Sequence, residues 1–143
     1  MNRNRKGFTL VELLMVVIII GILISIAIPN YFKTIERTKG GSAKAVLDSV
    51  RKAELQYRAM YGNFADVAVG DWAAGDISAF DYPEVLATAA GDDGNWIYTV
   101  QNSTADVFEA VATRGANAPT AYQGVTMILD QDGLFSSENP VHL

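Results

Sequence analysis

The chain contains no cysteine among its 143 residues, and histidine occurs once, as His142 beside the C-terminal residue. Without cysteine, neither a disulfide framework nor a thiolate metal site is possible. A single histidine at the end of the chain excludes an interior Ser/His/Asp triad and any multi-histidine metal site. Because no acid, base and nucleophile form a catalytic set, we expect that the protein is not an enzyme and uses no cofactor.

Basic residues are almost missing from the C-terminal part of the chain. From Ala59 onward twelve acids accompany a single base, Arg114, whereas residues 29–58 hold seven bases and three acids. The whole chain has a formal net charge of −5. A nucleic-acid-binding domain normally presents a basic surface, so the acidic C-terminal part argues against that role.

Polar residues are nearly absent from Phe8 to Ile28, where only Thr9, Glu12, Gly21 and Ser25 interrupt an apolar run. As a helix, this run would be about 32 Å long, which is enough to cross a bilayer. A cleaved secretory signal peptide is the alternative, since three basic residues precede the run. The run is long for a signal peptide and no clean A-x-A site follows it, so we favour a retained membrane helix.

Glu12 is the unusual residue of this run, because it places a carboxylate inside a spanning helix. Such residues are functional candidates by default and need a partner. No Lys or Arg occurs between Lys6 and Lys33, so the run itself supplies no base. The alternative is that Glu12 lies one turn inside the membrane interface, where it is hydrated or protonated.

The residues around Glu12 read Lys6-Gly7-Phe8-Thr9-Leu10-Val11-Glu12 and follow a short basic leader. This motif resembles the prepilin processing site of type IV pilins and type II secretion pseudopilins, and the similarity is close as far as about Tyr31. The resemblance implies that a prepilin peptidase cuts between Gly7 and Phe8 and methylates the new amine of Phe8. It also implies that this amine pairs with Glu12 of a neighbouring subunit during assembly.

The resemblance also implies four segments along the chain. These are a leader peptide at residues 1–7, a transmembrane and filament-core helix at 8–28, an amphipathic continuation of that helix at 29–61, and a globular head at 62–143. Gly21 and Pro29 weaken the helix, and in type IV pili the equivalent stretch loses helical structure on packing. We therefore expect a kink there in the isolated subunit and local melting in the polymer.

The sequence after Pro29 has the periodicities of an α+β protein. Apolar residues recur at helical spacing from Ala43 to Met60 and Tyr61, and Gly62 is the expected stop. An irregular loop, with a short helix opened by Pro83, then leads to the strands of the head. Alternating residues predict strands at 96–101, 107–113, 125–130 and 134–136, with Asp132-Gly133 as the last hairpin turn. We expect a pilin-like α+β fold, in which the C-terminal half of a long N-terminal helix packs on a small antiparallel sheet.

Two acidic clusters have the composition of calcium-binding loops. They are Asp92-Asp93-Gly94-Asn95 and Asp130-Gln131-Asp132-Gly133. Neither has the full EF-hand pattern with its terminal glutamate, and turn chemistry explains both. Major pseudopilins carry a calcium site near the C-terminus, so Asp130 and Asp132 remain minor candidates for a metal site.

Together these features favour a structural subunit of a type IV pilus, held in the inner membrane as a precursor and then polymerised into an extracellular filament. Its partners would be other copies of itself, the prepilin peptidase, the inner-membrane pilus assembly machinery and, before assembly, membrane lipid. A type II secretion pseudopilin is the alternative within the same family. From a different class, a monomeric signal-anchored domain with an acidic binding face is the alternative.

Overall fold

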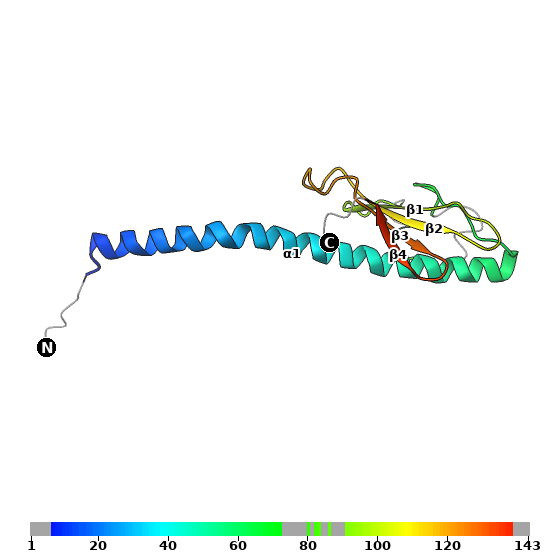
Figure 1. Ribbon diagram of the computed structural model, residues 1–143, viewed down its shortest axis with the longest axis horizontal. Coiled ribbons are helices and arrows are strands. Elements are labelled where there is room, and N and C mark those ends of the chain that lie inside the picture. Colours follow the sequence, from blue (N-terminus) through cyan, green and yellow to red (C-terminus); the bar gives the residue numbers. More distant parts are fainter. Residues whose placement is uncertain (1–6, 73–79, 81, 84–85, 87–90, 139–143) are drawn as a thin grey trace. The chain divides into compact units, whose positions relative to one another are not determined.

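A computed structural model of the chain describes residues 7–72, 80, 82–83, 86 and 91–138. Within these residues one helix, α1 (Leu10–Tyr61), precedes four strands (Figure 1). The strands are β1 (Trp96–Gln101), β2 (Glu109–Arg114), β3 (Thr126–Asp130) and β4 (Phe135–Glu138). The chain divides into two compact units, Met1–Thr38 and Lys39–Leu143, so the boundary falls within α1. Each unit is described by itself.

The first unit contains the apolar part of α1, and its helical backbone runs through Gly21 and Pro29 without a break. Proline has no N–H group, so the carbonyl of Ser25 loses its usual helical donor. Polar side chains beside Pro29 bond to the backbone of the preceding turn: Ser25 Oγ donates to the Ile22 carbonyl at 2.7 Å, and Asn30 Nδ2 donates to the Ile26 carbonyl at 3.3 Å. The helix is continuous at these residues, and the expected kink stays a prediction.

In the second unit, α1 contributes a stripe of buried apolar side chains to the core of the head. Ala43, Leu47, Val50 and Ala53 are each at most 1% exposed, and they pack with side chains of β1, β2 and β3. Burying a large apolar side chain stabilises a fold by about 1.5–3 kcal/mol. The stripe is shorter than predicted, because the last turn of α1 lies beyond this core and leaves Met60 73% exposed.

Gly62 ends α1, as the sequence predicted. Its φ of +81° lies in the left-handed region, and its N–H donates to the Arg58 carbonyl at 2.8 Å. Glycine adopts this conformation without a steric penalty, which is why it commonly follows the last residue of a helix.

The four strands form one antiparallel sheet in the order β1-β2-β3-β4. Tyr98 lies opposite Ala112, and Ala112 lies opposite Met127, so buried side chains of neighbouring strands share the face that packs on α1. The preceding loop adds single bridges at Val67–Val100 and Asp92–Ile97. This arrangement confirms the predicted α+β, pilin-like fold.

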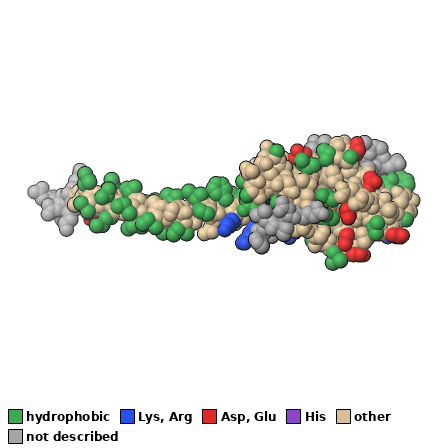
Figure 2. All heavy atoms as spheres, turned by 45° about the horizontal axis from the view of Figure 1, so that its top comes forward, with side chains coloured by type: hydrophobic (Ala, Val, Ile, Leu, Met, Phe, Trp, Pro, Cys, Tyr) green, Lys and Arg blue, Asp and Glu red, His purple; other side chains and the backbone are tan. Residues whose placement is uncertain are grey.

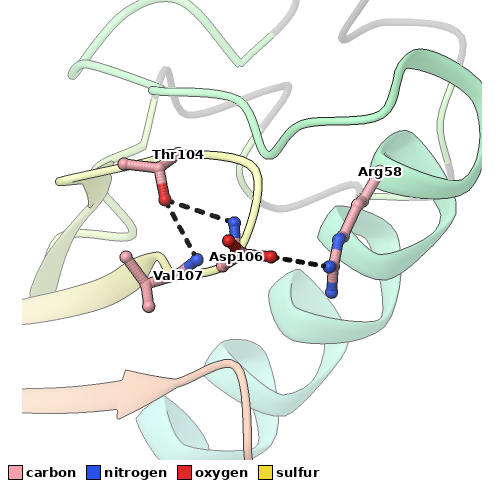
Figure 3. A network of polar contacts seen from close by, with 4 residues as sticks. All are labelled: Arg58, Thr104, Asp106 and Val107. Atoms are coloured by element: carbon pink, nitrogen blue, oxygen red, sulfur yellow. Dashed lines mark hydrogen bonds and ion pairs between the residues drawn. The ribbon is translucent and has the colours of Figure 1, made fainter.

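The strand bounds differ from the predicted ones mainly at β2, which begins at Glu109 rather than Val107. Thr104 Oγ1 accepts hydrogen bonds from the N–H groups of Asp106 and Val107, both at 3.2 Å, and these bonds keep Val107 in the turn (Figure 3). Arg58 of α1 reaches this turn through Asp106, with a 3.3 Å ion pair. Both partners are exposed, so the pair contributes at most about 1 kcal/mol.

Three of the other predicted elements agree closely with the structure, and one lies mostly outside it. β1 has the predicted bounds, and β3 starts one residue later than predicted. β4 begins at Phe135 instead of Leu134 and runs to Glu138. The short helix expected after Pro83 falls mostly on residues that the structure does not describe.

Candidate functional site

The start of α1 is a reciprocal pair formed by Thr9 and Glu12. The Glu12 N–H donates to Thr9 Oγ1 at 3.2 Å, and the Thr9 N–H donates to Glu12 Oε2 at 2.9 Å. The first N–H groups of a helix have no helical acceptor, and this capping box satisfies two of them. The T-x-x-E signature marks this pair in the sequence, but the prediction considered only bases as partners of Glu12 and so missed Thr9.

The capping box also fixes the direction of the Glu12 carboxylate. Oε2 accepts from both the N–H and the hydroxyl of Thr9, each at 2.9 Å, so the group faces the N-terminal end of α1. Oε1 accepts no hydrogen bond from any residue between 7 and 138 that the structure describes. A negative charge at this end of a helix is favoured by the helix dipole. The site can therefore hold a cationic group at the second carboxylate oxygen.

Gly7 and Phe8 lie just before the helix, in non-helical backbone. A Cβ atom added at Gly7 would meet nothing within 4 Å, and Phe8 is 85% exposed. An exposed and non-helical peptide bond is the kind that a protease can reach. The predicted cleavage position is therefore accessible and directly precedes the capping pair.

The apolar segment that follows Glu12 is uncovered along its whole length. Every large apolar side chain from Phe8 to Ile28 is between 48% and 85% exposed. By length and composition α1 can cross a membrane, and Figure 2 shows these side chains in green around the helix. Gly21 and Pro29 lie on α1 in turns separate from Glu12. Apolar surface of this extent normally marks contact with a membrane or another protein.

Asp130 and Asp132 lie in the turn between β3 and β4, where the backbone uses the Asp130 carboxylate. Asp130 Oδ1 accepts from the N–H groups of Asp132 at 3.0 Å and Leu134 at 2.8 Å. In the earlier cluster, Asp92 Oδ1 likewise accepts from the N–H of Gly94 at 2.8 Å. No group of three or more His, Cys, Asp or Glu side chains could hold a metal ion among the described residues. Hydrogen bonds that aspartate oxygens accept from the N–H groups of their own turns account for an acid in each cluster.

A buried carboxylate that our sequence reading missed lies in the core of the head. Glu54 is fully buried, and it accepts hydrogen bonds from the Tyr82 hydroxyl at 2.6 Å and the Ala65 N–H at 2.9 Å. Burial raises the pKa of Glu54, and the nearby Asp66 adds to this, while the two hydrogen bonds act in the opposite direction. The sequence feature that could have identified Glu54 is its position within the apolar stripe, four residues after Val50. Its two hydrogen bonds connect the loop residues Ala65 and Tyr82 to α1.

Comparison with known proteins gives one family model for the N-terminal segment and several type IV pilin and fimbrial relatives. A family model described as the prokaryotic N-terminal methylation motif matches residues 2–28. The type IV major fimbrial protein FimA of Dichelobacter nodosus is 32% identical over 129 residues, which cover 89% of this chain and 82% of FimA. A fimbrial protein of the same organism is 34% identical over 143 residues, covering 92% of this chain and 83% of the relative. The type IV major pilin protein PilA of Myxococcus xanthus (strain DK1622) is 42% identical over 67 residues, 47% of this chain but only 30% of PilA.

The uncovered apolar helix, the capping pair at its start and the antiparallel sheet define a membrane-anchored α+β protein with a prepilin-like N-terminus. The similarity to the two Dichelobacter nodosus proteins extends over most of both chains. The chain belongs to the type IV pilin family, as the motif around Glu12 indicated.

Proposed function

We propose that the chain is a structural subunit of a type IV pilus rather than an enzyme. A prepilin peptidase cuts the precursor between Gly7 and Phe8 and methylates the new amine. The helix at residues 8–28 then holds the subunit in the inner membrane until the assembly machinery adds it to an extracellular filament. This proposal rests on the family, on the accessible Gly7–Phe8 junction and on the methylation motif at residues 2–28.

The observation that carries the proposal is the uncovered apolar segment with an oriented carboxylate at its start. Water cannot be the permanent surrounding of so large an apolar surface. Lipid covers it before assembly, and other copies of the same segment cover it in a filament. A monomeric anchored domain needs the lipid contact and uses Glu12 as a helix cap, but it gives no role to Oε1, the carboxylate oxygen that Thr9 does not bind.

Cleavage supplies a partner for this carboxylate. An α-amino group has an ordinary pKa of about 7.7–8.0, so the Phe8 amine is largely cationic at neutral pH. Thr9 holds one oxygen of Glu12, which leaves Oε1 for the amine of the next subunit. Two charges that are each unfavourable in lipid neutralise one another when they meet in the filament core. Glu12 thus selects an incoming subunit and sets its register.

The experiment is to count filaments on cells that express Glu12→Gln or Glu12→Ala. We expect both variants to reach the membrane in normal amounts but to form few or no filaments. Asp48→Asn is the matched control, because Asp48 is an acid of the same helix whose described ion pair is with Lys52. Normal filaments from the Glu12 variants would refute the assembly role, and short fibres confined to the envelope in the wild type would favour a pseudopilin.

We also propose that α1 loses helical structure between Gly21 and Pro29 when it packs in the filament. Glycine is less favourable than alanine in a helix by about 0.8–1.0 kcal/mol, and Pro29 has removed one hydrogen bond already. The double variant Gly21→Ala/Pro29→Ala should give filaments that extend less under force. An extension equal to that of wild-type filaments would contradict local melting at these residues.

A further inference from the structure

The end of the apolar segment carries an aromatic pair on the surface of α1. Tyr31 and Phe32 are 66% and 57% exposed, and their ring centroids are 6.4 Å apart in an edge-to-face arrangement. Tyr and Trp side chains are enriched where a spanning helix leaves the hydrocarbon and meets the lipid headgroups, and Tyr31 is of this kind. This pair marks the membrane boundary of α1, an assignment that rests on the proposed membrane anchoring.

Two basic side chains follow directly on one face of the same helix. Lys33 and Arg37 are four residues apart, so their side chains lie about 40° apart around the helix axis. Both side chains are exposed, and neither forms a hydrogen bond or ion pair with another residue that the structure describes. Other bases further along α1 do have partners: Lys52 pairs with Asp48 at 2.7 Å, and Lys44 lies over the Phe135 ring at 5.9 Å. Figure 2 shows blue basic side chains where the green apolar stretch ends.

The length of α1 relates these two bases to Glu12. Lys33 lies five residues beyond Ile28, or about 8 Å along the helix, and long basic side chains extend toward the headgroups while their stems stay on apolar surface. The distance along the helix from Glu12 to Lys33 is about 32 Å, close to the ~30 Å thickness of the hydrocarbon core. If Lys33 lies at the phosphates of one leaflet, Glu12 lies at the boundary of the other.

We propose that Lys33 and Arg37 form a binding site for acidic phospholipid headgroups, which fixes the depth of the unassembled subunit in the bilayer. Phosphate is the complementary partner, because guanidinium groups bind it through two hydrogen bonds and ammonium groups bind it as point charges. The aromatic pair and the adjoining apolar segment bring these two bases to the headgroups of any bilayer the helix crosses. At this depth the Glu12 carboxylate stays near water until assembly supplies the Phe8 amine.

The test measures lipid selectivity of the full chain in vesicles of phosphatidylcholine that contain spin-labelled phosphatidylglycerol or spin-labelled phosphatidylcholine. The fraction of motionally restricted label reports which lipid contacts the helix. A basic residue near an anionic surface contributes about a fivefold preference, so Lys33 and Arg37 should contribute about 5- to 25-fold to the preference for phosphatidylglycerol. Lys33→Gln/Arg37→Gln should lower the preference by this factor, to the part that Arg3, Arg5 and Lys6 contribute before Phe8, whereas Lys44→Gln/Lys52→Gln removes the same charge further along α1 and should preserve it.

Equal selectivity in the wild type and the Lys33/Arg37 variant would overturn the proposal, and so would an equal loss in both double variants. If the Lys33/Arg37 variant keeps its lipid preference but no longer polymerises, the two bases serve contacts between subunits instead. Flotation with the vesicles checks insertion first. A wild-type chain that does not float would count against the proposed membrane anchoring itself, which separates that failure from a failure of the lipid site.

Discussion

Replacing Glu54 by alanine should lower the free energy of unfolding of the head by about 2–6 kcal/mol. In the folded chain its carboxylate accepts from the Tyr82 hydroxyl at 2.6 Å and from the Ala65 N–H at 2.9 Å. Both donors belong to buried residues, and each buried group left without a partner costs about 1–3 kcal/mol. A domain of this size has a stability of about 5–15 kcal/mol, so a large share is lost.

The assay is thermal unfolding of the full chain in detergent micelles, followed by near-ultraviolet circular dichroism. Both tryptophans, Trp72 and Trp96, are buried in the head, so this signal reports the head and not the apolar segment. We expect the Tm of Glu54→Ala to fall by at least about 8 °C. Asp48→Ala is the control, because it removes an exposed ion pair with Lys52 that contributes less than about 0.5 kcal/mol. An equal decrease in Tm for the two variants would refute the stabilising role of the Glu54 hydrogen bonds.

The same carboxylate should make stability depend on pH. Burial raises the pKa of Glu54 above its ordinary value of 4.5, so the folded head binds this proton more tightly than the unfolded chain does. The part of the stability that is linked to this proton is therefore fully present below pH 4.5 and is lost as the pH rises through the raised pKa of the folded state. Glu54→Gln should remove this part of the dependence. Identical pH slopes for Glu54→Gln and the wild type would contradict the assignment.

Thr9→Val keeps the shape of the side chain but removes the capping hydroxyl, and we expect a loss of about 1 kcal/mol in local helix stability. Hydrogen exchange at the Glu12 amide should be faster in Thr9→Val than in Thr9→Ser, and equal rates would argue against the cap. Gly91→Ala should destabilise the head more than Gly94→Ala does, by the same tryptophan signal. Both glycines have positive φ, +85° and +80°, which costs alanine about 1–2 kcal/mol. Only at Gly91 would the new Cβ also lie 2.4 Å from Trp72 Nε1, so equal losses would be inconsistent with the packing there.

Local patterns predicted the parts of the fold whose causes are local. β1 has the predicted bounds because Trp96, Tyr98 and Val100 alternate with less buried residues, and α1 ends at the glycine that the sequence marked. β2 begins later than predicted because Thr104 binds the N–H of Val107, and a turn of this kind leaves no periodic signal.

The same distinction applies to the functional residues. A short contiguous motif predicts the Gly7–Phe8 junction and Glu12 as functional residues, and the capping-box signature would have predicted the bond from Thr9 to Glu12. The partners of Glu54 could not be predicted in this way, because Ala65 and Tyr82 lie 11 and 28 residues further along the chain. Only the folded loop brings them to the carboxylate, so the sequence showed an acid in an apolar stripe but not the groups that it binds.

The proposed function requires that the chain is cleaved after Gly7 and then polymerises. The most direct measurement is the intact mass of the protein sheared from the surface of its native cells. We predict a mass that lacks Met1 to Gly7 and carries one added methyl group. A full-length chain, or one cut near Ala27, would contradict prepilin processing and would instead support an anchored or secreted monomer.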